Sequence, residues 1–484
     1  MGTKDRRSQI IFITAALTVL LLSRYVFVFF DQISFDSDQA LAGLLAKHIS
    51  EFKSFSLYPY GLDYMLALES FLAAPVFAVF GQGITQLKMP VLVMNIATLI
   101  MLMAVLVREC GLKPHEAFLS SLFFAVPNAL VSCRLSDAQG GNIEPFMFMI
   151  LMWILRRRPA ALGIIAAIGF MNREFVLYGI FWLVAIQAFN REIEIKSLLK
   201  SACYFIIAFL ALKALSFIPG DSIITNSAGQ NFSGGFIASI PSNIKFLCAN
   251  LLPAVLGLKE IDPKQYEITS GVILNSGAMR YTALLMYAVI VCVFSGVVFR
   301  ENKKLVSRKY SFALYLLLIG ISSCAGFIVM GEKFRHVMHI RYILLVILIP
   351  AGMSVMIFSA GRKRIAGAAA AFAIIAISAV NLYGAGLITA EYFNNPPPDK
   401  YGDLADYLVQ SNIEYSLSDY WTAYNVTFRT GEKAIVVPTK HSRIKSYYDM
   451  YFGNIENSYV ISRSVSTGCP VVHEWSICRQ AGER

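Results

Sequence analysis

The chain begins with a long apolar run, IIFITAALTVLLLSRYVFVFF (residues 10–30), and continues almost at once into SFDSDQALAGLLAKHI (residues 34–49). The first run reaches the ~20 residues that a helix needs to cross a bilayer. It is longer than the apolar core of a signal peptide and has no clear small-residue cleavage site, so it predicts an uncleaved first membrane span. Asp36 and Asp38 follow where the chain leaves the membrane, just before an apolar-patterned helix. Two carboxylates are therefore expected at the lip of the membrane.

The composition defines the class of protein. Hydrophobic residues make up 56% of the 484 residues and charged residues only 15%, whereas a soluble domain has about 25% charged residues. This contrast predicts a polytopic membrane protein. The net charge of +11 does not indicate nucleic-acid binding, because the basic residues cluster in short gaps between apolar runs, as at 156–158, 300–309 and 362–364. Such clusters are typical of cytoplasmic loops.

The basic clusters also predict a topology. With the N-terminus inside and the gap at 108–113 cytoplasmic, only one of the apolar runs 64–80 and 88–107 can cross. The first of them carries Asp63 and Glu69, so we interpret it as an amphipathic helix on the outer surface. About eleven spans result, and they cover 8–30, 88–107, 117–133, 142–155, 160–172, 174–190, 201–218, 281–299, 311–330, 342–360 and 365–388.

The same pattern predicts the domain organisation. Residues 1–393 form the transmembrane domain, with a first outer loop at 31–87 that carries juxtamembrane helices. The proline-rich segment NNPPPDK at 394–400 is a stiff linker. Residues 401–484 then read as a small α/β domain on the extracytoplasmic side, because helix-like and strand-like patterns alternate with turns. Its cysteines Cys469 and Cys478 are candidates for a disulfide in an oxidising compartment.

Carboxylates at a membrane lip suit several tasks. Asp36 and Asp38 can act as a general base on an acceptor hydroxyl, bind a divalent cation such as Mg²⁺ or Mn²⁺, or gate an ion path. The simpler reading is that they cap the following helix and face water, since acidic residues favour a helix start. The residues alone leave these readings open.

Other polar residues collect on the expected outer face. Basic residues near span ends can hold a phosphate or pyrophosphate, although each of them can also snorkel to the lipid headgroups. The candidates are Arg173, in the tight turn MNRE, together with Arg341, Arg134 and Arg335. A second acidic or acceptor site has as candidates Asp63, Glu69, Asp137 and Glu144, the last two within SCRLSDAQGGNIEP at 132–145. A carboxylate base opposite a phosphate cradle is the layout for attack on a lipid-phosphate-linked group.

Several of these segments resemble one superfamily in order along the chain. FDSDQALAGLLAKHI resembles the opening of the first outer loop of GT-C glycosyltransferases, such as the protein O-mannosyltransferases and the aminoarabinose transferases of lipid A. YPYGLDYMLALESFLAAPVFAVFG (58–81), IGFMNREFVLYG (168–179), RYILLVILIPAG (341–352) and SDYWTAYNVTFRTGEKAIVV (418–437) are similar to later parts of these enzymes. Two departures stand out: Gln39 replaces the usual acidic partner, and Arg173 replaces the lysine of the tight turn.

The resemblance implies a function. The donor would be a sugar linked to a polyprenyl phosphate, with the phosphate on Arg173 and Arg341. Asp38 would serve as the base for an acceptor hydroxyl that attacks the anomeric carbon with inversion, and Asp36 matches the acidic residue two positions earlier. The acceptor would be an envelope glycan, glycolipid or protein, and the protein would reside in the bacterial inner membrane.

Two other functions remain as alternatives. One is a flippase or transporter of lipid-linked sugars, against which stand the large outer loops and the near absence of acidic residues within the spans. The other is an O-antigen-type polysaccharide polymerase, but such enzymes typically lack the amphipathic loop after the first span.

Overall fold

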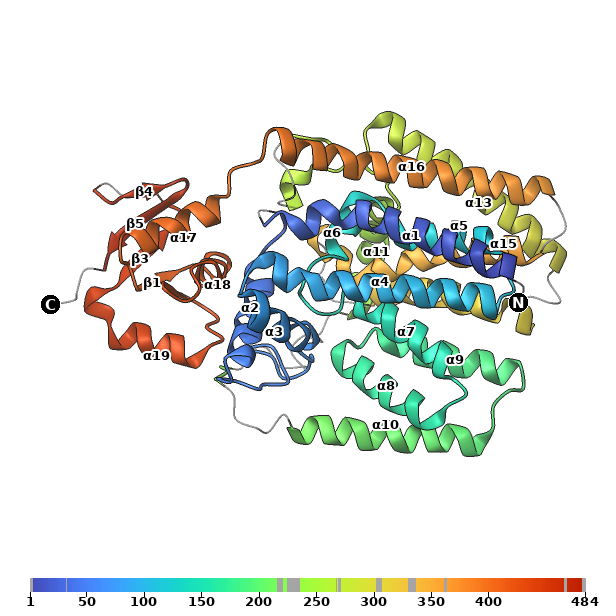
Figure 1. Ribbon diagram of the computed structural model, residues 1–484, viewed down its shortest axis with the longest axis horizontal. Helices are drawn as coiled ribbons and strands as arrows, with labels where there is room; N and C mark the ends of the chain where they lie inside the picture. The colour runs from blue at the N-terminus through green and yellow to red at the C-terminus, as the bar shows by residue number, and fades with distance from the viewer. Residues whose placement is uncertain are drawn as a thin grey trace.

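The computed structural model describes residues 3–480 except 32, 216–220, 224–235, 267, 269–270, 302–306, 330–336, 361–363 and 465–467. Figure 1 shows a bundle of long helices with a small sheet and its helices at one end and the N-terminus at the other. Helices α2 and α3 lie between the bundle and the sheet.

Seven helical stretches in the described residues are long and apolar enough to cross a membrane. They contain α1 (Thr3–Phe29), α4 (Ile84–Arg108), α10 (Ile195–Leu215), α13 (Gly277–Glu301), α14 (Ser311–Ile328), the 3₁₀ helix η7 (Val337–Ile347) continuing into α15 (Leu348–Ala360), and α16 (Arg364–Asn394). Shorter apolar helices are α3 (Leu68–Phe80), α7 (Glu144–Leu155), α8 (Pro159–Asn172) and α9 (Val176–Phe189). The prediction of a polytopic helical protein is thus confirmed.

The span predicted at 117–133 is not one continuous helix. The structure has two helices there, α5 (Pro114–Ala125) and α6 (Ala129–Arg134). Pro127 lies in the break, where its missing N–H and fixed backbone angle are incompatible with a helix interior. Asn128 then caps α6 by accepting a hydrogen bond from the Val131 N–H at 3.1 Å. This break turns the chain into the loop at 135–143, which becomes part of the candidate site.

The remaining helices that precede the C-terminal sheet are short. The first outer loop contributes α2 (Ser37–Ser50), and the segment after α10 contributes α11 (Phe236–Phe246), η2 (Leu247–Leu251), α12 (Leu252–Val255) and η3 (Pro263–Tyr266). A single 3₁₀ turn, η5 (Arg308–Tyr310), precedes α14.

The C-terminal part folds around one mixed sheet. Its strands are β1 (Tyr415–Ser418), β2 (Ile435–Pro438), β3 (Tyr459–Ser462), β4 (Val471–Val472) and β5 (Trp475–Arg479), in the order β2-β1-β3-β5-β4. The first three are parallel, whereas β5 runs antiparallel to β3 and β4. The helices are α17 (Lys400–Gln410), α18 (Tyr420–Arg429), α19 (Lys445–Gly453) and the 3₁₀ turn η8 (Ile455–Asn457). The predicted small C-terminal α/β fold is confirmed, and Cys469 and Cys478 are joined by a disulfide within it.

Helix α18 fixes this sheet to the first outer loop. Asn425 donates from Nδ2 to the Phe35 carbonyl at 2.9 Å, and Ser37 Oγ donates to the Trp421 carbonyl at 2.8 Å. The ring of Phe428 lies so close to Gly43 that a Cβ there would stand 2.4 Å from it. Helices α2 and α18 therefore pack in direct contact, and a glycine at 43 makes that approach sterically possible.

Candidate functional site

Asp36 is the N-cap of α2. Its backbone is extended (φ −121°, ψ 175°), and its Oδ1 accepts a hydrogen bond from the Gln39 N–H at 3.0 Å. The simple capping role considered from the sequence therefore holds for Asp36. Its second oxygen, Oδ2, has a different partner, because the side-chain amide of Gln139 donates to it.

Asp38 stands in the first turn of the same helix and points to the C-terminal part of the chain. Its Oδ1 accepts a hydrogen bond from the Tyr420 hydroxyl at 2.6 Å, and Arg443 Nη1 lies 3.7 Å away. The Arg443 guanidinium also lies 5.0 Å from the centre of the Tyr420 ring. The Asp38 carboxylate remains 28% exposed, so it is held by a hydroxyl and a cation but still open to a substrate.

The charge of Asp38 affects two of its neighbours. Burial, and next the negative charge of Asp38, raise the pKa of Asp36 to about 7, although the Gln39 N–H acts in the opposite direction. Burial and Asp38 likewise raise the pKa of Tyr420 well above its ordinary value. Tyr420 therefore keeps its proton at neutral pH and acts as a donor to Asp38.

The loop between α6 and α7 links the carboxylates to two cations. Gln139 donates to Asp36 and accepts from Arg341 Nη1 at 3.5 Å. One residue further, the Gly140 carbonyl accepts from Arg173 Nε at 3.3 Å and Nη2 at 3.1 Å. Gln39 supports this loop from α2 by accepting from the Ala138 N–H at 3.0 Å. Residues 138–140 thus contact the Asp36 carboxylate and the guanidinium groups of Arg341 and Arg173.

Glycine is required at position 141 of this loop. Its φ of +82° lies in the left-handed region, and a Cβ would stand 2.1 Å from Arg173 Nε. A side chain would therefore displace the Arg173 guanidinium. The paired glycines let this arginine lie directly on the loop backbone.

Arg341 also contacts a tyrosine. Arg341 lies on the 3₁₀ helix η7, an unusually long element of this type that often marks a functional site, and donates from Nη2 to the Tyr342 hydroxyl at 3.3 Å. Burial raises the pKa of Tyr64, and the nearby charges of Arg173 and Arg341 both act against that rise. Arg173 and Arg341 thus contact neighbouring residues of one loop, Gly140 and Gln139, in an arrangement suited to an anionic ligand.

The other predicted site residues fall in different places. Arg134 pairs with Asp137 at 2.8 Å inside the protein, with Asp137 also accepting from Ser34 at 3.1 Å. Arg134 is therefore the counter-charge of a buried carboxylate beside Asp36. Arg335 lies outside the described residues.

The remaining predicted acids do not surround Asp38. Glu69 and Glu144 are buried, and Glu144 Oε2 accepts from the Gly141 N–H at 2.8 Å. Burial, reinforced by the Glu144 charge, raises the pKa of Glu69 well above its ordinary value. Asp63 instead contacts Lys213, which donates to its backbone carbonyl at 3.1 Å.

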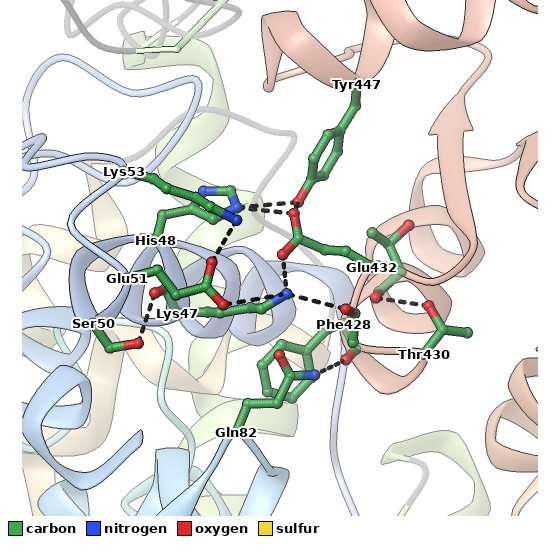
Figure 2. A network of polar contacts seen from close by, with 12 residues as sticks. Lys47, His48, Ser50, Glu51, Lys53, Gln82, Phe428, Thr430, Glu432 and Tyr447 are labelled. Atoms are coloured by element: carbon green, nitrogen blue, oxygen red, sulfur yellow. Dashed lines mark hydrogen bonds and ion pairs between the residues drawn. The ribbon is translucent and has the colours of Figure 1, made fainter. Parts of the chain in front are cut away.

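A second polar network joins the last turn of α2 to the C-terminal part of the chain (Figure 2). Glu432 pairs with Lys47, while its Oε1 lies 3.0 Å from His48 Nε2 and accepts from the Tyr447 hydroxyl at 2.6 Å. Burial alone would raise the pKa of Glu432, but the hydrogen bonds from His48, Lys47 and Tyr447 lower it to about 2. We call these four residues the Glu432 latch, because they join α2 to the turn between α18 and β2 and to α19.

Sequence reasoning missed four residues of the site. Gln39 was noted only as a departure from a pattern, and Gln139, Tyr420 and Arg443 were not singled out. Within the described residues, no group of three or more His, Cys, Asp or Glu side chains is placed to hold a metal ion.

Comparisons with known proteins identify solved structures with a similar fold. No family model matches the chain, and no curated protein matches it in sequence. Solved structures do match. ArnT from Cupriavidus metallidurans, crystallised with undecaprenyl phosphate, has a TM-score of 0.58 at 10% identity over 98% of each chain. The archaeal oligosaccharyltransferase AglB from Archaeoglobus fulgidus, solved with an inhibitory peptide and a dolichol-phosphate, has a TM-score of 0.54 at 11% identity over 95% of this chain and 70% of its own. The chain has a GT-C-like fold. The resemblance to GT-C glycosyltransferases that the sequence suggested is thereby confirmed at the level of the fold.

Proposed function

We propose that the protein is a membrane glycosyltransferase that moves a sugar from a polyprenyl-phosphate-linked donor to a hydroxyl of a cell-envelope glycan, glycolipid or protein. One observation carries the proposal: the loop at 138–140 contacts Asp36, two residues before Asp38, on one side and Arg173 and Arg341 on the other. A carboxylate base and two arginines that can bind a phosphate, joined through one loop, are suited to displacement of a phosphate leaving group.

In the proposed reaction, an Asp38 oxygen accepts the proton of the acceptor hydroxyl. The hydroxyl oxygen forms a bond to the anomeric carbon while the bond from that carbon to the donor phosphate breaks, which inverts the configuration. The leaving group is the polyprenyl phosphate, and the electron pair of the broken bond stays on its phosphate oxygen. Arg173 and Arg341 stabilise the charge that develops on it.

Tyr420 and Arg443 position the base in this scheme. The 2.6 Å hydrogen bond from Tyr420 fixes one Asp38 oxygen. The other oxygen has no hydrogen-bond partner among the described residues and is available to the acceptor. Both oxygens of Asp36 accept from N–H donors of Gln39 and Gln139, so the pair offers few free oxygens for a divalent cation. We therefore derive no step through a metal.

The lipid-linked donor is supported by the two matched structures, which were solved with undecaprenyl phosphate and with a dolichol-phosphate. The basic clusters favour a cytoplasmic N-terminus and an extracytoplasmic site in the bacterial inner membrane. In this orientation residues 1–393 form the catalytic membrane domain, 394–400 the linker and 401–484 the outer domain.

The test is sugar transfer from native envelope lipid extracts by purified protein, with folded yield in detergent measured in parallel. Asp38→Asn is expected to lower transfer by about 10²–10⁴-fold at normal yield, the usual contribution of a general base. Asp31→Asn is the matched control, because Asp31 lies on the same loop and its carboxylate accepts a hydrogen bond only from Thr85 among the described residues, at 2.9 Å. Full transfer by Asp38→Asn would refute the assignment of the base.

A further inference from the structure

A second candidate binding site lies at the opposite end of the bundle. A cavity of about 560 Å³ opens among α5, α13, α15 and α16. Arg364, which lines it, begins α16, and the other end of this 31-residue helix leads to the C-terminal sheet (Figure 1). At 1.5 Å per residue, the two ends of α16 are ~45 Å apart. The cavity is therefore separate from the Asp38 site and on the side of the N-terminus.

Cations from three helices face this cavity. Lys113 is the N-cap of α5, Arg300 lies in the last turn of α13, and Arg364 begins α16. All three are exposed, and among the described residues none of them pairs with a carboxylate. Two acids also line the cavity, Glu116 and Glu301. Glu116 is engaged in capping, since its Oε2 accepts from the Lys113 backbone N–H at 2.9 Å.

The walls of the cavity are apolar and contain two open glycines. Val293 and Val297 of α13 and Phe358 of α15 contribute apolar surface. Gly296 on α13 and Gly367 on α16 also line it, and a Cβ added to either would meet no atom within 4 Å. The helices thus leave space beside the cations that a hydrocarbon chain can fill.

From this geometry we infer that the cavity binds an anionic phospholipid, with its phosphate on Lys113, Arg300 and Arg364 and an acyl chain against α13 and α15. Cations that merely snorkel need no cavity between them. Three unpaired cations beside an apolar recess match a molecule with a phosphate head and a hydrocarbon tail. The two helix N-termini at Lys113 and Arg364 add to the attraction for the phosphate. The inference is independent of the proposed transferase activity.

Native mass spectrometry of the purified full-length chain, supplied with phosphatidylglycerol or phosphatidylcholine, tests the inference. The wild type is expected to retain phosphatidylglycerol preferentially. The double variant Gly296→Leu with Gly367→Leu fills the recess and keeps every charge, and it is expected to retain at least about tenfold less. Unchanged retention by this variant would overturn the inference.

A charge variant and its control complete the test. The triple change Lys113→Gln, Arg300→Gln and Arg364→Gln is expected to lower retention at least about tenfold, since each basic side chain near a lipid surface contributes separately. The control is the exposed triple change at the α9–α10 junction, Arg191→Gln, Lys196→Gln and Lys200→Gln, which removes the same charge elsewhere. Equal losses in both variants would reduce the effect to general surface charge and refute the site.

Inorganic phosphate distinguishes a lipid site from a phosphate site. If the acyl chain contributes, phosphate should not displace phosphatidylglycerol from the wild type. Displacement by phosphate alone, or binding of phosphate without lipid, would overturn the lipid assignment. If the charge variant fails to fold, as judged by its melting temperature, lipid retention by the glycine variant alone tests the inference.

Discussion

The Glu432 latch allows a quantitative prediction. The change Glu432→Gln keeps the size of the side chain but removes the charge that Lys47 and His48 contact. We expect α18 to separate from α2 more often in this variant. Because Tyr420 lies on α18, Asp38 would then lose its hydroxyl partner, and sugar transfer should fall with the docked population.

The magnitude follows from the pKa of Glu432. The drop from 4.5 to about 2 corresponds to about 3.4 kcal/mol at 1.36 kcal/mol per pH unit. The carboxylate keeps 15% of its surface exposed, and solvent screening reduces the value to roughly 2 kcal/mol. That is a change of roughly 30-fold in the undocking equilibrium. Since the folded pKa is depressed, this stabilisation is complete above pH 4.5 and is lost as the pH falls towards 2.

Hydrogen exchange measures the effect. Amides of α2 and α18 exchange through undocking, so their exchange should accelerate by up to roughly 30-fold in Glu432→Gln at neutral pH. Glu456→Gln, on the exposed turn η8, serves as the control. If exchange in α2 and α18 is the same in both variants, the latch does not hold the two parts together and the reasoning fails.

Three further predictions concern the site itself. Because Asp36 has a pKa of about 7 and its ionisation places a second negative charge beside Asp38, transfer should rise with pH through about 7 in the wild type but not in Asp36→Asn; identical pH profiles would contradict this. Gly141→Ala should raise the KM for the donor by displacing Arg173. Gly81, whose φ of +77° is similar but whose surroundings are open, provides the control: Gly81→Ala should lower only the stability, by about 1 kcal/mol. An equal effect of the two changes on KM would refute the role of the loop. Removal of divalent cations with EDTA should leave the transfer rate unchanged, because both oxygens of Asp36 accept from N–H donors; a loss that Mg²⁺ or Mn²⁺ restores would show that these contacts yield to a metal.

Local signals in the sequence predicted the local structure well. The cap at Asp36 and the helix after it follow from residue types that prefer these positions, and the apolar runs predicted the long helices because burial in lipid demands continuous hydrophobicity. The run at 64–80 was expected on the surface, yet Glu69 of α3 is buried. Its neighbour Glu144, whose charge helps to raise the pKa of Glu69, is 75 positions away in the sequence, and no local pattern encodes that proximity.

The site could not be assembled from sequence for the same reason. Asp38 and Tyr420 are separated by 382 positions, and no period or spacing connects them. Gln139 links Asp36 to Arg341 with a neutral amide, a side chain that stands out in no charge pattern. Arg173 drew attention because it lies in a tight turn, but its contact with Gly140 depends on how α8 returns to the glycine loop.

The contact between Asp38 and Tyr420 has a consequence for biosynthesis. Asp38 leaves the ribosome long before Tyr420 and Arg443, because both follow it by several hundred positions in the sequence. Under the proposed function, the base reaches its working geometry only after the final helices have inserted and the C-terminal sheet has folded against α2. An incompletely synthesised chain would therefore carry the carboxylates and the arginines in the membrane without consuming the lipid-linked sugar.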